Sequence, residues 1–297
     1  MNPSSHPASG PAARLGRIGI WSAELRFAPP AEAHAAAQEL EEFGWPAAWM
    51  PGGLDDKVLE DLDRLLSATQ RITLATGILN IWKHEPADVG AWWRGQTPQR
   101  QARLMIGVGV SHAPAIGAAY QRPLEKMRDF LERVLAEGLP REQLCVAALG
   151  PKMLELSAEL TAGAHPYLVP PEHTAIARKI LGPEAWLAPE QGAVLETDPA
   201  RARELARQAL TTYLTLPNYL NSWRRLGFGE DDFAGRGSDR LIDALFVWGD
   251  AEAIRRRVQA HFDAGADHVC VQAVSGQISA NLGPPRAVWR ELAPVLL

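Results

Sequence analysis

His112 is the residue whose type and position most favour acid–base chemistry. It follows the apolar run 104–108 directly, at the point where a buried strand would end. An imidazole has an unperturbed pKa near neutrality, so it can both accept and donate a proton at physiological pH. A loop histidine that only hydrogen-bonds to the backbone fits the same pattern equally well. His112 is therefore a candidate general acid or base.

A second candidate is the turn Gly150-Pro151-Lys152-Met153, which follows the apolar run 144–149 and opens a helix. An anion bound there would meet the free N–H groups of a helix N-terminus together with a lysine. Gly-Pro is also ordinary chemistry for a strand-to-helix turn. The spacing alone leaves both a phosphate site and a plain turn open.

The chain contains ten tryptophans, a high number for its length. Trp21, Trp49 and Trp82 fall at or near predicted strand ends, where indoles could wall a pocket for a planar ligand. Core packing alone accounts for the others.

The sequence lacks the usual motifs of several other catalytic and metal sites. His84, His165 and His173 fall in predicted loops, but no H-x-H pair, H-E-x-x-H motif or carboxylate cluster accompanies them, so no metal site is expected. The G-x-S-x-G signature of serine hydrolases is absent. Cys145 and Cys270 lie far apart in apolar runs with no C-x-x-C pair, which indicates two buried, reduced thiols.

The composition is that of an ordinary globular protein, with 46% hydrophobic and 22% charged residues and a net charge of −5. No dense basic run is present beyond 255–257, which the pattern places on a solvated helix face, so we expect no nucleic-acid partner. No stretch approaches the ~18 apolar residues of a membrane span. Residues 1–14 lack the apolar segment of a signal peptide and are predicted to form a disordered tail of a cytoplasmic protein.

Short apolar runs alternate with helical patterns from Gly16 onward, and these elements position the candidate residues. Such alternation is typical of βα units with a parallel sheet. The predicted strands are 17–21, 47–50, 72–79, 104–108, 144–149, 164–169, 192–196 and 268–272. Asp198 and Asp250 are predicted helix N-caps, and Gly44 and Gly265 are predicted helix stops.

Eight strands separated by amphipathic helices predict an α/β fold, a closed (β/α)8 TIM barrel that occupies residues 15–297 as a single domain. Segment 217–247 departs from the repeat and is predicted to form a helical insertion over the barrel mouth. Active sites of such barrels lie at the C-terminal ends of the strands, which is where the candidate residues fall.

The segment Leu104–Met127, LMIGVGVSHAPAIGAAYQRPLEKM, resembles the "GxGxSH…YxRPLxxM" block of the luciferase-like flavin- and F420-dependent oxidoreductases. Further segments resemble the family in the same order along the chain, from Leu15 to Val274. They are 15–21, 75–82, 148–153, 164–167, 171–174, 216–219 and 265–269. The blocks at 104–127 and 164–174 look most like the F420-dependent branch.

The resemblance implies a flavin or deazaflavin in the barrel mouth, with the cofactor held by three loops. These are the turn after the third strand, with a non-prolyl cis bond at Gly77-Ile78 and with Asn80; the loop Val110, Ser111 and His112; and the phosphate-binding turn Gly150, Pro151, Lys152 and Met153. His112 would handle the proton, and Trp21, Trp49 and Trp82 would pack against ring or substrate.

Two departures separate the chain from the F420-dependent sugar-phosphate dehydrogenases. Those enzymes carry an acid–histidine pair after the second strand, where this chain has Pro51-Gly52-Gly53. They carry a glutamate where this chain has His112. That particular activity is therefore not expected, and the role of His84 stays open.

The expected function is hydride transfer between coenzyme F420 and a small organic substrate. The alternative is a luciferase-like monooxygenase that uses reduced FMN and oxygen. An alternative of another class is a protein that binds a flavin or deazaflavin without turnover. Relatives often dimerise, which makes a homodimer one expectation of the resemblance.

Overall fold

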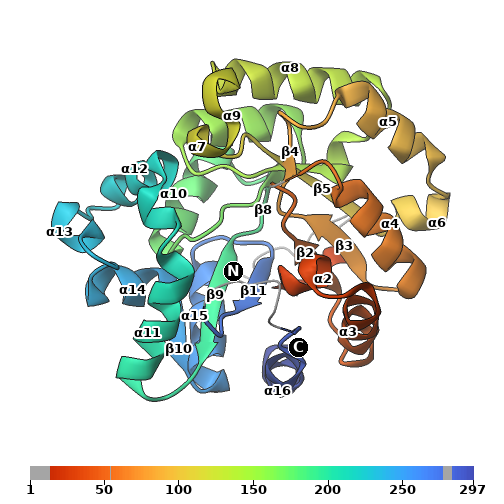
Figure 1. Cartoon of the computed structure of the whole chain (residues 1–297). Helices are drawn as coiled ribbons and strands as arrows, with labels where there is room; N and C mark the ends of the chain where they lie inside the picture. The colour runs from red at the N-terminus through yellow and green to blue at the C-terminus, as the bar shows by residue number, and fades with distance from the viewer. Residues whose placement is uncertain (1–13, 54, 277–282) are drawn as a thin grey trace, which may run out of the picture.

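Short parallel strands form one curled sheet in the middle of the molecule, and helices surround it (Figure 1). The computed structural model describes residues 14–53, 55–276 and 283–297. The predicted tail 1–14 lies outside the described residues, apart from Arg14.

The strands follow one another around the sheet with parallel pairing throughout. They are β1 Ile18–Trp21, β2 Ala47–Met50, β3 Thr73–Thr76, β4 Leu79–Asn80, β5 Leu104–Gly109, β6 Leu144–Val146, β7 Gly163–Ala164, β8 Trp186–Leu187, β9 Glu190–Leu195, β10 Phe246–Gly249 and β11 Val269–Ala273. Their order is β10-β9-β11-β1-β2-β3-β5-β6-β7-β8, with β4 paired to β5.

The strand order has two ends, so the expectation of a closed eight-stranded barrel is confirmed only in its coarser form, a TIM-barrel-like half-barrel. The ends are β8, which pairs with β7, and β10, which pairs with β9. Pro189 separates β8 from β9 and has no N–H to continue a ladder. Single hydrogen bonds nevertheless join this stretch to β11, because Asp267 N donates to Leu187 O at 2.8 Å and Cys270 N to Pro189 O at 3.1 Å.

Helices follow most strands, as the repeat predicts. They are α2 Glu24–Phe27, α3 Pro30–Glu42, α4 Val58–Ala68, α5 Pro86–Gly95, α6 Pro98–Gln101, α7 Ala113–Ile116, α8 Pro123–Ala136, α9 Pro151–Leu160, α10 Pro171–Leu181, α11 Pro199–Leu210, α12 Pro217–Arg225, α13 Glu230–Phe233, α14 Asp239–Leu245, α15 Ala251–Asp263 and α16 Arg286–Leu296. Short 3-10 helices are η1 Gly117–Ala119, η2 Arg141–Gln143 and η3 Tyr213–Thr215. None of the described helices combines the length and the apolar character of a membrane span.

Helix boundaries agree with the expected caps. Asp198 Oδ1 accepts from Arg201 N, and Asp250 Oδ1 accepts from Ala253 N, both at 2.8 Å. Gly44 and Gly265 follow α3 and α15 with φ of 90° and 99°, a conformation in which glycine has no steric penalty.

Several strand predictions were wrong in their limits. The predicted strand 72–79 is divided into β3 and β4 at Gly77-Ile78, and the predicted strand 164–169 shrinks to β7 because Pro166 and Pro170 cannot donate to a ladder. Strand β8 was not predicted, and neither was β10, which lies at the end of the predicted insertion. The rest of that insertion forms α12, α13 and α14, as expected.

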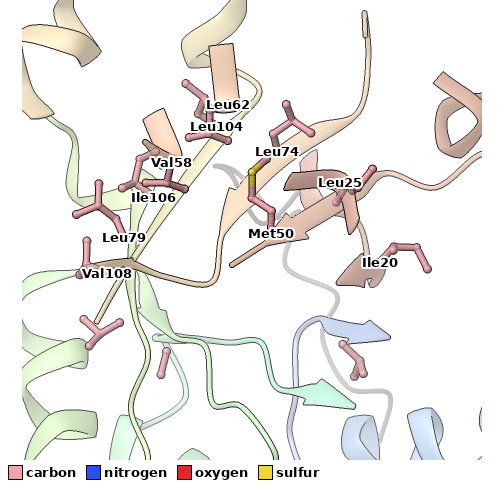
Figure 2. Close-up of a cluster of buried hydrophobic side chains, with 14 of the residues drawn as sticks. Ile20, Leu25, Met50, Val58, Leu62, Leu74, Leu79, Leu104, Ile106 and Val108 are labelled. Carbon is pink, nitrogen blue, oxygen red and sulfur yellow. The ribbon is translucent and has the colours of Figure 1, made fainter. Parts of the chain in front are cut away.

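Alternate side chains of each strand point to opposite faces of the sheet, and both faces are buried. Outward-facing residues such as Ile20, Met50, Leu74, Leu104 and Ile106 pack against Leu25 of α2 and Val58 and Leu62 of α4 (Figure 2). Inward-facing residues form a second cluster inside the curl, which contains Trp21, Ala47, Trp49, Ala75, Met105, Cys145, Trp186 and Cys270. Both cysteines are free thiols and buried. Burial on both faces explains why the strands read as continuous apolar runs.

Candidate functional site

His112 lies at the C-terminal end of β5, where it precedes the short helix α7. Its Nδ1 is 3.3 Å from Asn218 Oδ1, and its ring lies 5.7 Å from that of Tyr219. Burial lowers the pKa of His112, while the hydrogen bond to Asn218 opposes that shift. The imidazole is therefore neutral at neutral pH, and because Nδ1 donates to an amide oxygen, its lone pair is on Nε2.

Both contacts of His112 come from α12, the first helix of the insertion. The other end of α12 carries Arg225, whose guanidinium donates to Leu149 O at 3.3 Å. Seven residues of helix separate Asn218 from Arg225, a rise of about 10 Å. One helix thus contacts two candidate regions at the C-terminal ends of β5 and β6.

The turn Gly150-Pro151-Lys152 begins α9, with Gly150 as its N-cap and Pro151 at the first helical position. Leu149 O accepts from both Arg225 and His173, the latter at 3.0 Å. The point where a Cβ of Gly150 would lie is 3.6 Å from the Arg225 guanidinium. Burial lowers the pKa of Arg225. A helix N-terminus beside Lys152 and Arg225 has the donors that a phosphate requires.

The third predicted region, at the end of β3, has the backbone geometry that the resemblance implied. The Gly77-Ile78 peptide bond is cis, and both residues are partly exposed. Asn80 is buried, with Nδ2 donating to Gly53 O at 2.9 Å and Oδ1 accepting from Trp82 N at 3.0 Å. Asn80 therefore holds the loops after β2 and β4 together.

Val110 and Ser111 continue the rim from β5 toward His112. Val110 O accepts the indole N–H of Trp82 at 2.8 Å. Ser111 is buried and adopts a φ of 54°, a conformation that costs a residue with a side chain about 1–3 kcal/mol. Such residues concentrate at functional sites, and Leu168, after β7, is another with a φ of 53°.

The three tryptophans proposed as pocket walls occupy different depths. Trp82 is partly exposed and lies 5.6 Å from the Tyr120 ring. Trp21 is buried at the end of β1 and packs against Tyr167. Trp49 is fully buried inside the curl, where its N–H donates to His268 Nε2 at 3.2 Å and its ring stacks on His165 at 4.2 Å. Trp49 thus belongs to the packed interior of the sheet and does not line a pocket at the strand ends.

Backbone carbonyl groups hold two further histidines, His84 and His268, whereas His261 contacts the side chains of Thr174 and Gln191. Both ring nitrogens of His84 face carbonyl oxygens, Asn80 O at 3.0 Å and Asp56 O at 3.2 Å, so its role is to fix the loop after β2. His268 Nδ1 lies 2.8 Å from Gly16 O. Among the described residues, no three His, Cys, Asp or Glu side chains gather as a metal-ligand set.

Sequence reasoning missed a buried carboxyl group, that of Glu190, and the tyrosines near it. Glu190 Oε2 accepts from Leu168 N at 3.0 Å, while Oε1 is buried with no partner in the described part of the chain. Burial raises the pKa of Glu190 to about 8, which the Leu168 hydrogen bond partly opposes. Tyr213 donates to Tyr167, and Tyr167 donates to Gln272. An acidic residue directly after a proline in an apolar run was the available signal.

Two F420-dependent enzymes are among the solved structures that share this fold. One is an F420-dependent secondary alcohol dehydrogenase in complex with an F420-acetone adduct. Its TM-score to this chain is 0.68 at 15% sequence identity, and the match covers 95% of this chain and 99% of that chain. The coenzyme F420 dependent tetrahydromethanopterin reductase from Methanopyrus kandleri gives 0.71 at 16% identity, with the same coverage. The chain has the luciferase-like fold.

The same fold includes flavin enzymes. The oxygenating constituent of 3,6-diketocamphane monooxygenase from Pseudomonas putida, in complex with FMN, gives a TM-score of 0.65 at 11% identity, with 95% of this chain and 96% of that chain covered. No family model and no curated protein matches the sequence. At these identities the likeness establishes the luciferase-like fold, and the activity has to be argued from the site.

We predict that the stability of the protein falls as pH rises through the window set by Glu190. The folded state keeps the carboxyl proton up to about pH 8, whereas the unfolded state loses it near the ordinary value of 4.5. The unfolded state therefore binds fewer protons between these values, which costs about 1.4 kcal/mol per pH unit.

Urea unfolding across that window, for the wild type and for Glu190→Gln, isolates this contribution. The glutamine retains an acceptor for Leu168 N–H and does not titrate, so the difference in unfolding free energy between the two proteins should change with pH. A difference that stays constant from pH 4.5 to about pH 8 contradicts the assignment.

Proposed function

We propose that this protein is an oxidoreductase that transfers a hydride between coenzyme F420 and a small organic substrate. The observation that carries the proposal is the double contact of α12, with His112 at one end and with the Gly150 turn at the other. It aligns a proton-transfer group with an anion-binding turn along one rim of the sheet. A cofactor with a redox ring at one end and a phosphate at the other requires that combination.

The residues present fit such a cofactor. Lys152 and Arg225 are exposed beside the α9 N-terminus and are available to a phosphate group. Gly77 and Ile78 offer a partly exposed apolar surface onto which a flat ring can pack. Val110, Ser111 and His112 follow Gly109, which borders the Ile78 side chain, and Met153 lies in the first turn of α9.

The luciferase-like neighbours support an oxidoreductase that uses a flavin or a deazaflavin. Two of them are F420-dependent by name, with TM-scores of 0.68 and 0.71, and the FMN complex gives 0.65. We favour F420 because the F420-dependent structures superimpose at least as well as the FMN enzyme and because the blocks at 104–127 and 164–174 resemble that branch.

In this mechanism the bound deazaflavin would supply the hydride chemistry, and the protein would supply position, dryness and proton transfer. His112 Nε2 carries a lone pair at neutral pH, so it can take the proton that a substrate releases when it loses a hydride. Asn218 fixes the ring through Nδ1 and stabilises the positive charge that forms on it. Tyr219 closes one side of the imidazole and limits its contact with water.

An FMN-dependent monooxygenase is the alternative, since FMN also combines a ring with a phosphate and an FMN complex shares the fold. Binding of either cofactor without turnover is the third proposal. Titration of the purified protein with F420 and, separately, with FMN, followed by tryptophan fluorescence, separates these cases. Saturable binding of F420 in preference to FMN supports the proposal, preference for FMN favours the monooxygenase, and binding of neither refutes all three.

We predict that Arg225→Ala and Lys152→Ala each weaken the binding of the preferred cofactor about tenfold, because each removes a charge-assisted hydrogen bond to phosphate. The effect should shrink at high salt, since exposed charges are screened. Lys179→Ala removes an exposed lysine near the end of α10 and serves as the matched control. Equal affinity of all four proteins would place the phosphate elsewhere.

We further predict that His112→Ala lowers kcat by about 100-fold or more, the usual contribution of a positioned acid or base. Cofactor affinity should change by much less, because the ring and phosphate contacts remain. Steady-state rates with a turned-over substrate, set beside the fluorescence titration, test both statements. Unchanged kcat would remove His112 from the proton transfer.

A further inference from the structure

A cavity lies at the N-terminal ends of β1 and β2, the end of the sheet opposite to the candidate functional site. Its volume is about 440 Å³, which is within the range of small-molecule sites. Apolar side chains from the two strand ends, α15 and α16 form its walls: Ile18, Pro46, Val258, Phe262, Val295 and Leu296. These walls suit a hydrocarbon group, because contact with them removes apolar surface from water.

Arg17 contributes a guanidinium group to the lining of this cavity. The guanidinium carbon lies 4.1 Å from the centre of the Phe262 ring, so the group is stacked on one of the apolar walls. Stacking on an aromatic face leaves the N–H groups at the edge of the guanidinium plane free to donate. Within the described part of the chain, no hydrogen bond or ion pair engages the Arg17 side chain.

Arg255, on α15, adds a second guanidinium group to the lining. Its Nε donates to Glu252 Oε2 at 2.9 Å, and this contact leaves the two terminal nitrogens of Arg255 available. Leu297 also lines the cavity, and it forms no ion pair with either arginine in the described structure. The cavity therefore combines apolar walls with two cationic groups that retain free N–H donors.

We propose that this cavity binds a small hydrophobic carboxylate, with its hydrocarbon part against the apolar walls and its carboxylate on Arg17 and Arg255. A guanidinium group presents parallel N–H donors at the spacing of two carboxylate oxygens. An uncharged hydrophobic molecule would leave both arginines without an acceptor, and a small hydrophilic anion would leave the walls in contact with water. The site is separate from the proposed cofactor site, so this inference does not rest on the proposed function.

The walls of the cavity are in place before a ligand arrives. Val258 and Leu296 are buried and belong to the hydrophobic core around the sheet, and α15 packs against α16. Arg17 is held by its stacking on Phe262. Binding therefore requires little ordering of the protein, which favours affinity for a ligand that fits.

Isothermal titration calorimetry of the full-length protein with octanoate tests the proposal. Octanamide keeps the hydrocarbon chain and lacks the charge, whereas acetate keeps the charge and lacks the chain. We expect octanoate to bind at least about tenfold more tightly than either control, because only octanoate uses both the guanidinium groups and the apolar walls. Equal binding of octanoate and either control, or no saturable binding of octanoate, overturns the proposal.

Substitutions of the two arginines locate the binding. Arg17→Met and Arg255→Met remove the charge and keep a long side chain, so each should weaken octanoate binding about fivefold. Arg256→Met is the matched control, because Arg256 is an exposed arginine of the same helix that does not line the cavity. Wild-type affinity in both Arg17→Met and Arg255→Met refutes the site.

A further variant fills the cavity. Gln259 is exposed, lines the cavity and donates to Asp263 Oδ1 at 2.8 Å, so its replacement leaves the core unchanged. Gln259→Trp should abolish octanoate binding, because the indole occupies the space that the hydrocarbon chain requires. Far-UV circular dichroism and thermal unfolding establish that the variant is folded. Octanoate binding of wild-type strength in folded Gln259→Trp contradicts the proposal.

Arg225→Ala keeps this test separate from that of the proposed function. Arg225 lies beside the Gly150 turn, at the other end of the sheet, so its loss should leave octanoate binding unchanged. If Arg225→Ala weakens octanoate binding and Arg17→Met does not, octanoate occupies the proposed cofactor site and the cavity proposal falls. If octanoate binds through Arg17 while neither F420 nor FMN binds, the cavity proposal stands and the oxidoreductase assignment falls.

Discussion

The interior of the curled sheet excludes water, so each polar atom placed there must find a partner within the protein or in a ligand. Deep in the interior this requirement is met: Trp49 donates to His268, and His268 contacts Gly16 O. Within the described part of the chain, it is not met at Trp21 Nε1 and His165 Nε2, at the ends of β1 and β7, nor at Oε1 of Glu190, the first residue of β9. Trp21 and His165 lie at the C-terminal ends of their strands, the end at which barrels of this kind bind ligands.

The same constraint shapes the histidines. His165 and His268 are held by backbone carbonyl groups and are kept neutral because burial disfavours the charged ring. His112 sits higher, with an amide partner from another segment of the chain. His165 and His268 therefore support the interior of the sheet, whereas His112 lies at the C-terminal end of β5.

Much of this arrangement could be predicted from the sequence. Apolar runs located most strands, and residues such as Asp198 and Asp250 identified helix starts, because these signals are local. The limits of β7 and the break at Pro189 coincide with prolines that the sequence contains, and the strand predictions gave too much weight to the apolar runs around them. Strand β10 was not predicted because its first residues, Phe246 and Val247, were assigned to the insertion 217–247.

The loops that form the candidate site could be predicted from the sequence, but the residues that contact them from distant segments could not. His112 and the Gly150 turn follow strands directly, so their position along the chain placed them at the rim. Asn218, Arg225 and Glu190 matter through contacts between distant segments, which no spacing rule contains. Trp49 was predicted to wall the pocket because it lies near a strand end, but its side chain is fully buried inside the sheet. A residue near a strand end can point into the interior as readily as toward a ligand.

Helix α12 contacts His112 at one end and the carbonyl group before the Gly150 turn at the other. Two sites that contact one helix have linked binding equilibria only to the extent that each ligand favours one position of that helix. An anion that shifts α12 when it binds at the turn also alters the proton affinity of the imidazole, and protonation alters the affinity for the anion by the same factor. Coupling through the insertion would appear as a His112 proton affinity that changes when an anion binds at the Gly150 turn.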